Sequence, residues 1–238
     1  MDYFYHPELR EDSEQIILST VESQHLARVL RKKEGDLIRL INGEGGTAKG
    51  KLIGVDSKGC LVQLFEYEQL KPLPYSIHIA IAPTKSNDRF EWFLEKATEI
   101  GVSEITPVLC QNSERRNIKW ERYEKIILSA TKQSQQAFKP KLNQLVSYRD
   151  FIKNNPNSTI AHCREGKKTP LHSVPVENSK IILLIGPEGD FTHEEIALAT
   201  AANGTAISLG KQRFRTETAG IIACHTVALR FDLSGNTD

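Results

Sequence analysis

The chain has 238 residues, of which 39% are hydrophobic and 26% are charged, and its 31 Lys and Arg residues nearly balance its 30 Asp and Glu residues. This composition is typical of a globular protein of one or two domains and excludes fibrous and disordered classes. The longest aliphatic run, residues 181–185, is far shorter than the roughly 20 residues of a membrane-spanning helix. Asp2 stands where a secretory signal favours positive charge. We therefore expect a cytoplasmic protein without a membrane span.

The cysteines do not have the spacing of a metal site. Cys60, Cys110, Cys163 and Cys224 are far apart in the sequence, whereas structural zinc sites place pairs of ligands a few residues apart. We expect reduced thiols and no bound metal.

Positive charge is concentrated in residues 113–168, which contain thirteen Lys or Arg and five Asp or Glu, a balance of +8. Residues 1–72 contain ten Lys or Arg and twelve Asp or Glu, a balance of −2. A basic stretch of this kind is either the solvated face of helices or a surface that binds a polyanion, and composition leaves both interpretations open.

The N-terminal region contains strand-like runs joined by glycine-containing turns, which is typical of a β-meander. These runs cover residues 37–41, 47–55 and 60–67. One short helix is expected at residues 23–31. Pro72 and Pro74 disfavour both strand and helix, so we place a domain boundary between residues 72 and 73.

From residue 73 to residue 238, strands alternate with helices. Strands are expected at residues 76–82, 104–109, 159–163, 180–185 and 205–209, and helices at residues 89–100, 119–138, 192–202 and 216–232. Thr192 and Glu195 have the spacing of a capping box, which marks the start of one helix. This alternation predicts an α/β domain with a mostly parallel sheet that is covered on both faces.

Several common catalytic motifs are excluded. Gly45, Gly50 and Lys51 match most of a phosphate-binding loop, but Leu52 replaces the required Ser or Thr, and a strand follows where a helix is needed. A glycine-rich hairpin explains these residues better. The fingerprints of dinucleotide dehydrogenases, serine hydrolases and zinc proteases are absent from the sequence.

Two loops, residues 186–190 and 209–219, each follow a predicted strand and lead into a helix. In open α/β sheets, ligands bind beyond the carboxyl ends of the strands, and small residues let a ligand approach the backbone. The second loop adds cations, hydroxyls and an acid. Ordinary turns are the alternative interpretation, and Thr216, Glu217 and Thr218 also suit the start of a helix.

These two loops carry a recognisable pair of motifs. The first is Gly186-Pro187-Glu188-Gly189-Asp190-Phe191-Thr192, and the second is Leu209-Gly210 followed by Phe214-Arg215-Thr216-Glu217-Thr218-Ala219. Supporting matches lie upstream, in order, at residues 25–31, 85–102 and 113–115. Together these motifs resemble the ribosomal RNA small subunit methyltransferase E family, and the resemblance covers nearly the whole chain.

The resemblance implies an α/β protein with a PUA-like, RNA-binding β-barrel at residues 1–72 and a SPOUT-type methyltransferase domain at residues 73–238 that ends in a trefoil knot. It also implies a homodimer. The implied reaction is the transfer of a methyl group from S-adenosylmethionine to N3 of one uridine in 16S ribosomal RNA, acting on that RNA or on the small ribosomal subunit.

The resemblance also implies roles for individual residues. The donor pocket would be formed by Ile185, Gly186, Pro187, Glu188, Gly189, Leu209, Gly210, Phe214, Arg215, Thr216, Glu217, Thr218 and Ala219. From the chemistry of the implied reaction, we expect Arg215 to stabilise the negative oxygen that forms on uracil, and Glu188 or Glu217 to accept the N3 proton if either lies near the base. The RNA surface would include Arg28, Arg31, Lys85, Arg115 and Arg116 with the basic stretch.

The chain departs from the family pattern at four positions. The family more often has an acid at Lys132, Gly-Arg at Gln135 and Gln136, and Leu at Phe214. Two other interpretations are compatible with the residues: a non-catalytic RNA-binding or assembly protein with the same fold, and an α/β enzyme that acts on a small nucleotide. Binding of S-adenosylmethionine would distinguish an enzyme from the non-catalytic protein. Activity without RNA would indicate the enzyme that acts on a small nucleotide.

Overall fold

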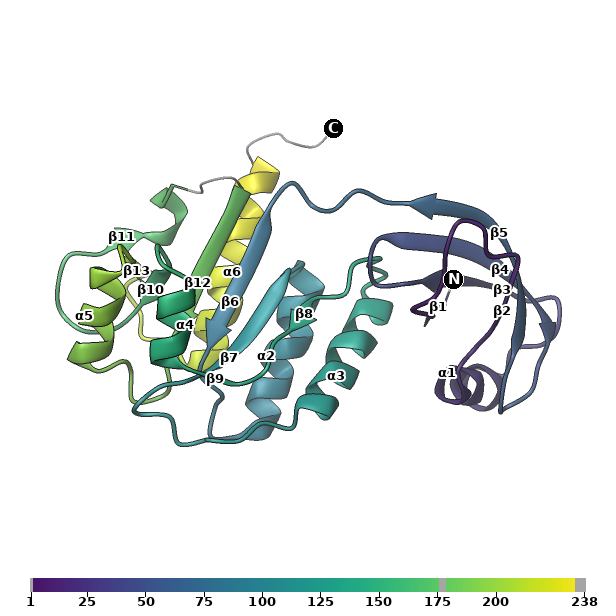
Figure 1. The fold of residues 1–238 in the computed structure, drawn as a ribbon, viewed down its shortest axis with the longest axis horizontal. Coiled ribbons are helices and arrows are strands. Elements are labelled where there is room, and N and C mark those ends of the chain that lie inside the picture. Colours follow the sequence, from purple (N-terminus) through teal and green to yellow (C-terminus); the bar gives the residue numbers. More distant parts are fainter. Residues whose placement is uncertain (1, 176–178, 234–238) are drawn as a thin grey trace. The chain divides into compact units, whose positions relative to one another are not determined.

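The computed structural model describes residues 2–175 and 179–233, which form two units with separate hydrophobic cores (Figure 1). The first unit comprises Met1–Pro72 and Leu128–Lys139, and the second comprises Leu73–Ile127 and Pro140–Asp238. The break after Pro72 lies at the expected domain boundary. Sequence patterns did not assign residues 128–139 to the first unit, because their contacts with it are distant in sequence.

The first unit is built on one curled sheet with the strand order β1-β3-β4-β5-β2. Its strands are β1 (Tyr3–Tyr5), β2 (Gln15–Ile17), β3 (Leu37–Ile41), β4 (Gly46–Gly54) and β5 (Leu61–Gln69). The antiparallel β3-β4-β5 meander confirms the sequence expectation. The strands β1 and β2 were not predicted, since three residues are too few to show a two-residue alternation.

The helix expected at residues 23–31 begins earlier in the structure and consists of an α-helical part and a π-helical part. An α-helix, α1 (Thr20–Gln24), begins after Ser19, whose Oγ accepts a hydrogen bond from the Glu22 backbone N–H. It continues as a wider π-helical turn, η1 (His25–Val29), in which the Leu30 N–H reaches the His25 carbonyl oxygen at 3.0 Å. Buried Leu26 anchors this segment in the core of the first unit.

The last part of a long helix belongs to the first unit. Helix α3 (Trp120–Gln133) ends five residues before the expected end at residue 138, and the chain then turns with a positive φ of 59° at Gln135. The Gly45 N–H donates to the Ala137 carbonyl at 3.0 Å. A Cβ at Gly45 would lie 2.4 Å from the Phe138 ring, so close packing requires glycine there, which supports the rejection of a phosphate-binding loop.

The second unit is an α/β domain with a parallel sheet, as predicted. The order along the sheet is β11-β13-β10-β12-β6-β7-β8, with β9 also paired to β7, and each of these pairings between described strands is parallel. The strands are β6 (Ser76–Ile81), β7 (Glu104–Leu109), β8 (Lys141–Leu142), β9 (Val146–Ser147), β10 (Thr159–Ala161), β11 (Thr169–Pro170), β12 (Lys180–Ile185) and β13 (Thr205–Ser208).

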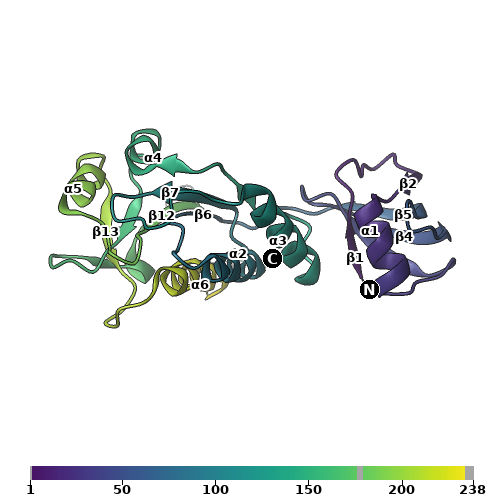
Figure 2. The ribbon, with the colours of Figure 1, turned by 90° about the horizontal axis from the view of Figure 1, so that it is seen from below.

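Helices cover both faces of this sheet, as Figure 2 shows. On one face lie α2 (Asn87–Ile100), α6 (Thr216–Leu233) and the beginning of α3; on the other lie α4 (Tyr148–Asn154) and α5 (His193–Ala201). Strand β6 separates two cores, since Ile77 and Ile79 pack on the α2 and α6 side and Ala80 packs on the α4 and α5 side. This alternation of buried residues is typical of a central parallel strand.

Within the described ranges, none of the helices combines the length and the apolar character needed to cross a membrane.

The helix α5 starts at the predicted capping box, where the Thr192 side chain accepts from the Glu195 N–H and the Glu195 carboxylate accepts from the Thr192 N–H.

A buried polar network links β6 to β7 and β8. His78 is 4% exposed, and its Nε2 lies 2.7 Å from the Thr106 hydroxyl, which also accepts a hydrogen bond from the Asn143 amide. Burial lowers the pKa of His78 to about 4, and the negative charge of Glu104 only partly opposes this effect. The folded protein therefore holds this imidazole neutral.

The His78 network predicts a loss of stability in mild acid. Below its ordinary pKa of 6.5, His78 binds a proton in the unfolded chain but stays neutral in the folded one until the pH approaches 4. The free energy of unfolding should decrease across this window by roughly 3 kcal/mol at most, and stay level from pH 7 to 8. Urea titrations at a series of pH values measure this.

The variant His78→Gln removes the titrating group and should flatten the decrease between pH 6.5 and 5. If the variant and the original chain lose stability in parallel over that range, other groups are responsible for the acid sensitivity.

Candidate active site

A cavity of about 350 Å³ lies at the carboxyl ends of the parallel strands in the second unit. Its lining comes from the last residues of β10 and β12 and from the segments that follow β10, β12 and β13: Ala161, Cys163, Ile185, Gly186, Pro187, Glu188, Asp190, Arg213, Phe214, Arg215, Thr216 and Ala219. This is the edge at which open parallel sheets bind ligands, and the volume falls in the roughly 300–1,000 Å³ range of small-molecule sites.

The first wall of the cavity is a tight turn after β12. The Asp190 N–H donates to the Pro187 carbonyl at 2.9 Å, and Asp190 adopts a positive φ of 63°, which Asp tolerates better than most residues. The Asp190 carboxylate fixes the turn by accepting from the N–H groups of Phe191 and Cys163. A Cβ at Gly186 would lie 2.9 Å from the buried Phe191 ring, so this position favours glycine.

The second wall is the loop between β13 and α6. Gly210 has a φ of 146°, and its N–H donates to the Ser208 hydroxyl at 3.3 Å. Helix α6 begins at Thr216, which is 5% exposed and whose hydroxyl donates to the Gly186 carbonyl at 2.9 Å. This hydrogen bond joins the two loops that the sequence singled out, so they enclose one cavity.

The structure divides the predicted donor-pocket residues into two sets. Eight line the cavity: Ile185, Gly186, Pro187, Glu188, Phe214, Arg215, Thr216 and Ala219. The others, Gly189, Leu209, Gly210, Glu217 and Thr218, lie in the same loops but are not among the lining residues.

Four lining residues were not predicted as pocket residues: Ala161, Cys163, Asp190 and Arg213. Strand β10 lies between β12 and β13, so its end projects between the two loops. The short strand expected at residues 159–163 was a usable signal, but sequence does not give the strand order that places it there.

The two acidic residues of the loops differ in environment. Glu188 is exposed, and its Oε1 accepts a hydrogen bond from the Lys85 backbone N–H at 2.9 Å. Glu217 is 7% exposed, and its Oε1 lies 3.8 Å from the Arg89 Nε. No described residue donates a hydrogen bond to the buried Oε2 of Glu217. Of the two acids, Glu188 is among the residues that line the cavity and Glu217 is not.

The predicted RNA-binding residues are also in different situations. Arg28 and Arg31 are exposed in the first unit, and Arg116 is exposed in the second. The Arg115 guanidinium donates to the carbonyls of Thr84 at 2.9 Å and Lys85 at 2.7 Å, so it holds the loop after β6.

The remaining predicted cation, Lys85, forms an exposed ion pair of 2.7 Å with Glu114. The basic stretch 113–168 is divided between the two units.

Comparisons with known proteins identify the family. Residues 71–228 match a family described as an RNA methyltransferase domain, and residues 22–65 match an RNA methyltransferase PUA domain. The ribosomal RNA small subunit methyltransferase E of Rickettsia conorii is 32% identical over 93% of this chain and 92% of its own length. The chain belongs to the ribosomal RNA small subunit methyltransferase E family. The resemblance stated from the sequence is thus confirmed.

Solved structures agree with this assignment to the methyltransferase E family. A ribosomal RNA small subunit methyltransferase E from Neisseria gonorrhoeae, bound to S-adenosyl methionine, is 26% identical with a TM-score of 0.87 over 98% of both chains. A structure from Porphyromonas gingivalis is 37% identical, with a TM-score of 0.88, and the match covers 98% of this chain and all of that one.

The bond between the two loops predicts a measurable contribution to stability. Thr216→Val keeps the size of the side chain but leaves the Gly186 carbonyl without its donor, which should lower the free energy of unfolding by about 1–3 kcal/mol. Chemical denaturation measures this change.

Thr200→Val is the matched control, because the exposed Thr200 hydroxyl bonds only to a carbonyl of its own helix, that of Ile196, at 2.9 Å. Equal effects of the two substitutions would show that the bond between the loops contributes nothing particular.

Proposed function

We propose that the chain transfers a methyl group from S-adenosylmethionine to N3 of a specific uridine in 16S ribosomal RNA, on the RNA or within the small ribosomal subunit. The observation that carries this proposal is the cavity enclosed by the two loops, joined through Thr216 and Gly186, in a member of the methyltransferase E family. The donor-bound Neisseria relative supports the choice of cofactor.

The lining of the cavity suits this donor. Ile185, Pro187, Phe214 and Ala219 offer apolar surface for an adenine ring, and the turn after β12 presents backbone groups for hydrogen bonds. When bound, the donor supplies a methyl group activated by a positively charged sulfur. The exposed Glu188 carboxylate at the rim lowers the electrostatic energy of a cation in this position.

The residues of the second loop suit the remaining chemistry. Uridine N3 carries a proton and becomes a good nucleophile only when that proton leaves, which places negative charge on the uracil oxygens. Arg215 lines the cavity and its guanidinium stays charged, so it stabilises this charge but cannot act as the base. Of the two acids, Glu188 is better placed to accept the proton because it lines the cavity, and Glu217 is the second candidate.

Binding of the RNA would involve both units. The PUA domain matched at residues 22–65 contains the exposed Arg28 and Arg31, and the second unit contributes Lys85 and Arg116, whereas Arg115 would act mainly by positioning Lys85. Phosphate contacts of this kind would make RNA affinity fall steeply with salt. The target uridine would be turned out of its stack to reach the cavity.

The wider proposal includes three features expected of the family. We infer a cytoplasmic homodimer with a C-terminal trefoil knot, an RNA-binding domain at residues 1–72 and a methyltransferase domain at residues 73–238. The matched ranges 22–65 and 71–228 support this division into domains.

Removing Arg215 should separate chemistry from cofactor binding. In Arg215→Ala, the rate of methyl transfer should fall roughly 100-fold, as for loss of one oxyanion-stabilising group, while the donor affinity measured by calorimetry changes little. Lys211→Ala removes an exposed cation from the same loop and serves as the control. An equal loss of rate and donor affinity would assign Arg215 to the cofactor pocket alone.

The substrate assignment is tested in cells. Mass spectrometry of small-subunit RNA from a strain that lacks this gene should show the loss of one N3-methylated uridine, which returns when the gene is restored. Unchanged methylation would contradict the proposal. Calorimetry that shows no binding of S-adenosylmethionine would instead indicate a non-catalytic RNA-binding protein.

A further inference from the structure

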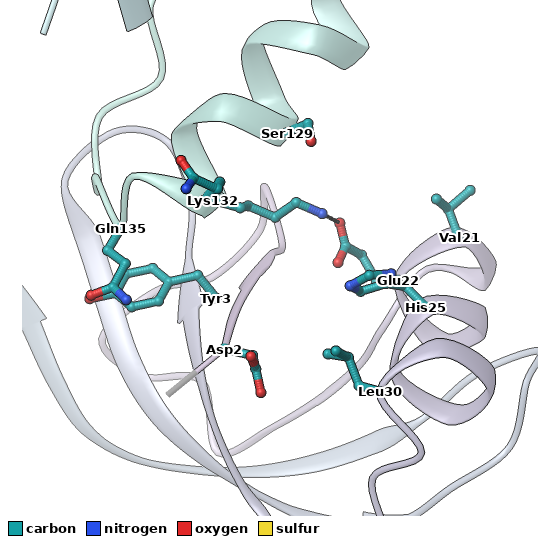
Figure 3. Close-up of a pocket in the computed structure, with 10 residues that line it drawn as sticks. Asp2, Tyr3, Val21, Glu22, His25, Leu30, Ser129, Lys132 and Gln135 are labelled. Carbon is teal, nitrogen blue, oxygen red and sulfur yellow. Dashed lines mark hydrogen bonds and ion pairs between the residues drawn. The ribbon is translucent and has the colours of Figure 1, made fainter. Parts of the chain in front are cut away.

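A second cavity, of about 460 Å³, lies within the first unit, far in sequence from the methyl-transfer loops (Figure 3). Strand β1, the α1 and η1 segment and the end of α3 enclose it. It is lined by Asp2, Tyr3, Val21, Glu22, His25, Leu30, Ser129, Lys132, Gln133 and Gln135. Nothing in the proposed methyl transfer uses these residues.

A buried ion pair lies at the edge of this cavity. The Lys132 Nζ is 2.5 Å from the Glu22 Oε1, and the two side chains are 21% and 6% exposed. Figure 3 shows Lys132 reaching across from the end of α3 to Glu22 on α1.

The Glu22 carboxylate lacks a donor. Its Oε2 is buried, and no described residue gives it a hydrogen bond. A buried carboxylate oxygen without a donor is costly, so native structures nearly always satisfy such atoms. The terminal torsion of Glu is broad, and a small rotation turns this oxygen toward a group that enters the cavity. The site therefore favours a ligand that brings N–H donors.

The ion pair presents the hydrogen-bond acceptors of the Glu22 carboxylate beside the donors of the Lys132 ammonium group. Lys132 uses one of its three ammonium protons on Glu22, and each carboxylate oxygen has two lone pairs, so both groups retain hydrogen-bonding capacity. The Watson–Crick edge of guanine has the complementary order: two N–H donors, at N1 and N2, beside the O6 acceptor. Uracil offers one N–H between two carbonyls, and adenine and cytosine place an unprotonated ring nitrogen against the carboxylate.

The walls suit a planar base. Tyr3 and His25 place aromatic rings at the cavity, and Gln133 and Gln135 add adaptable polar groups. Unstacked bases in RNA are held by aromatic side chains and by hydrogen bonds to their edges. The local backbone is also unusual, since His25 begins the π-helical turn and Gln135 has a positive φ of 59°; such features are frequent at functional sites.

We propose that this cavity binds an unpaired guanine of the RNA substrate, with Glu22 accepting from N1–H and N2–H and Lys132 donating to O6. The inference rests on the proposed function, because it assumes that RNA is the partner. It adds a base-specific contact to the phosphate contacts of Arg28 and Arg31, which carry no sequence information.

The first test uses the chain with its sequence unchanged. Fluorescence anisotropy compares short oligouridine RNAs in which the central base is guanine, hypoxanthine or uracil. We expect guanine to bind at least about fivefold more tightly than uracil, as for a bidentate base contact, with hypoxanthine in between because it lacks the N2 amino group. Equal affinities for the three RNAs would overturn the proposal.

Two variants test whether the preference for guanine arises in this cavity. Glu22→Gln should reduce the guanine preference to less than twofold, while Glu34→Gln, the same change at an exposed position of the first unit, should retain it. A folded Glu22→Gln variant with the full preference contradicts the role of Glu22. If this variant does not fold, photo-crosslinking of the unmodified chain to 6-thioguanosine RNA decides, because its reactive sulfur replaces O6. The crosslink is expected at Lys132 or at the neighbouring rings of Tyr3 and His25, and a crosslink outside the cavity overturns the proposal.

Methyl transfer to small-subunit RNA, measured on the same preparations, separates the two proposals. Methyl transfer without any guanine preference overturns only the base pocket. A guanine preference in a chain that transfers no methyl group supports the pocket and contradicts the proposed reaction.

Discussion

The hydrogen bond from the Thr216 hydroxyl to the Gly186 carbonyl joins two loops that are 30 residues apart in the sequence and that both line the cavity. The bond forms only because the sheet is parallel, so that β12 and β13 end at the same edge. Both partners sit where the backbone is already constrained, Gly186 against the Phe191 ring and Thr216 at the first turn of α6. The site is therefore a property of sheet direction as much as of its residues.

Much of this architecture was predictable from the sequence, because the relevant signals are local. Aliphatic runs, helical spacing and the Thr192 capping box placed the main strands and helices of the second unit to within a few residues. The errors arose where long-range contacts decide. Helix α3 stops early because the chain turns at Gln135 to meet the sheet of the first unit, and the short strands β1 and β2 exist only through pairing with distant strands.

The site was predicted less completely than the fold. The motifs identified the two loops, but strand order places the end of β10 between them, and no local pattern reveals strand order. Counting charges along the sequence also could not show where the charged side chains lie in the structure. The counts located a basic stretch, yet its members lie in both units, and several of its cations already bond to protein groups, such as Lys132 to Glu22 and Arg115 to two backbone carbonyls.

The bonds of Arg115 affect how genetic data on this protein should be interpreted. Its guanidinium holds the Thr84 and Lys85 carbonyls, and the Lys85 N–H in turn holds the Glu188 carboxylate at the cavity rim. A screen of surface arginines for impaired RNA modification would therefore recover Arg115 even if it never touches a nucleotide. A phenotype at this position reports on the shape of the cavity rim, and footprinting rather than activity is the way to map RNA contacts.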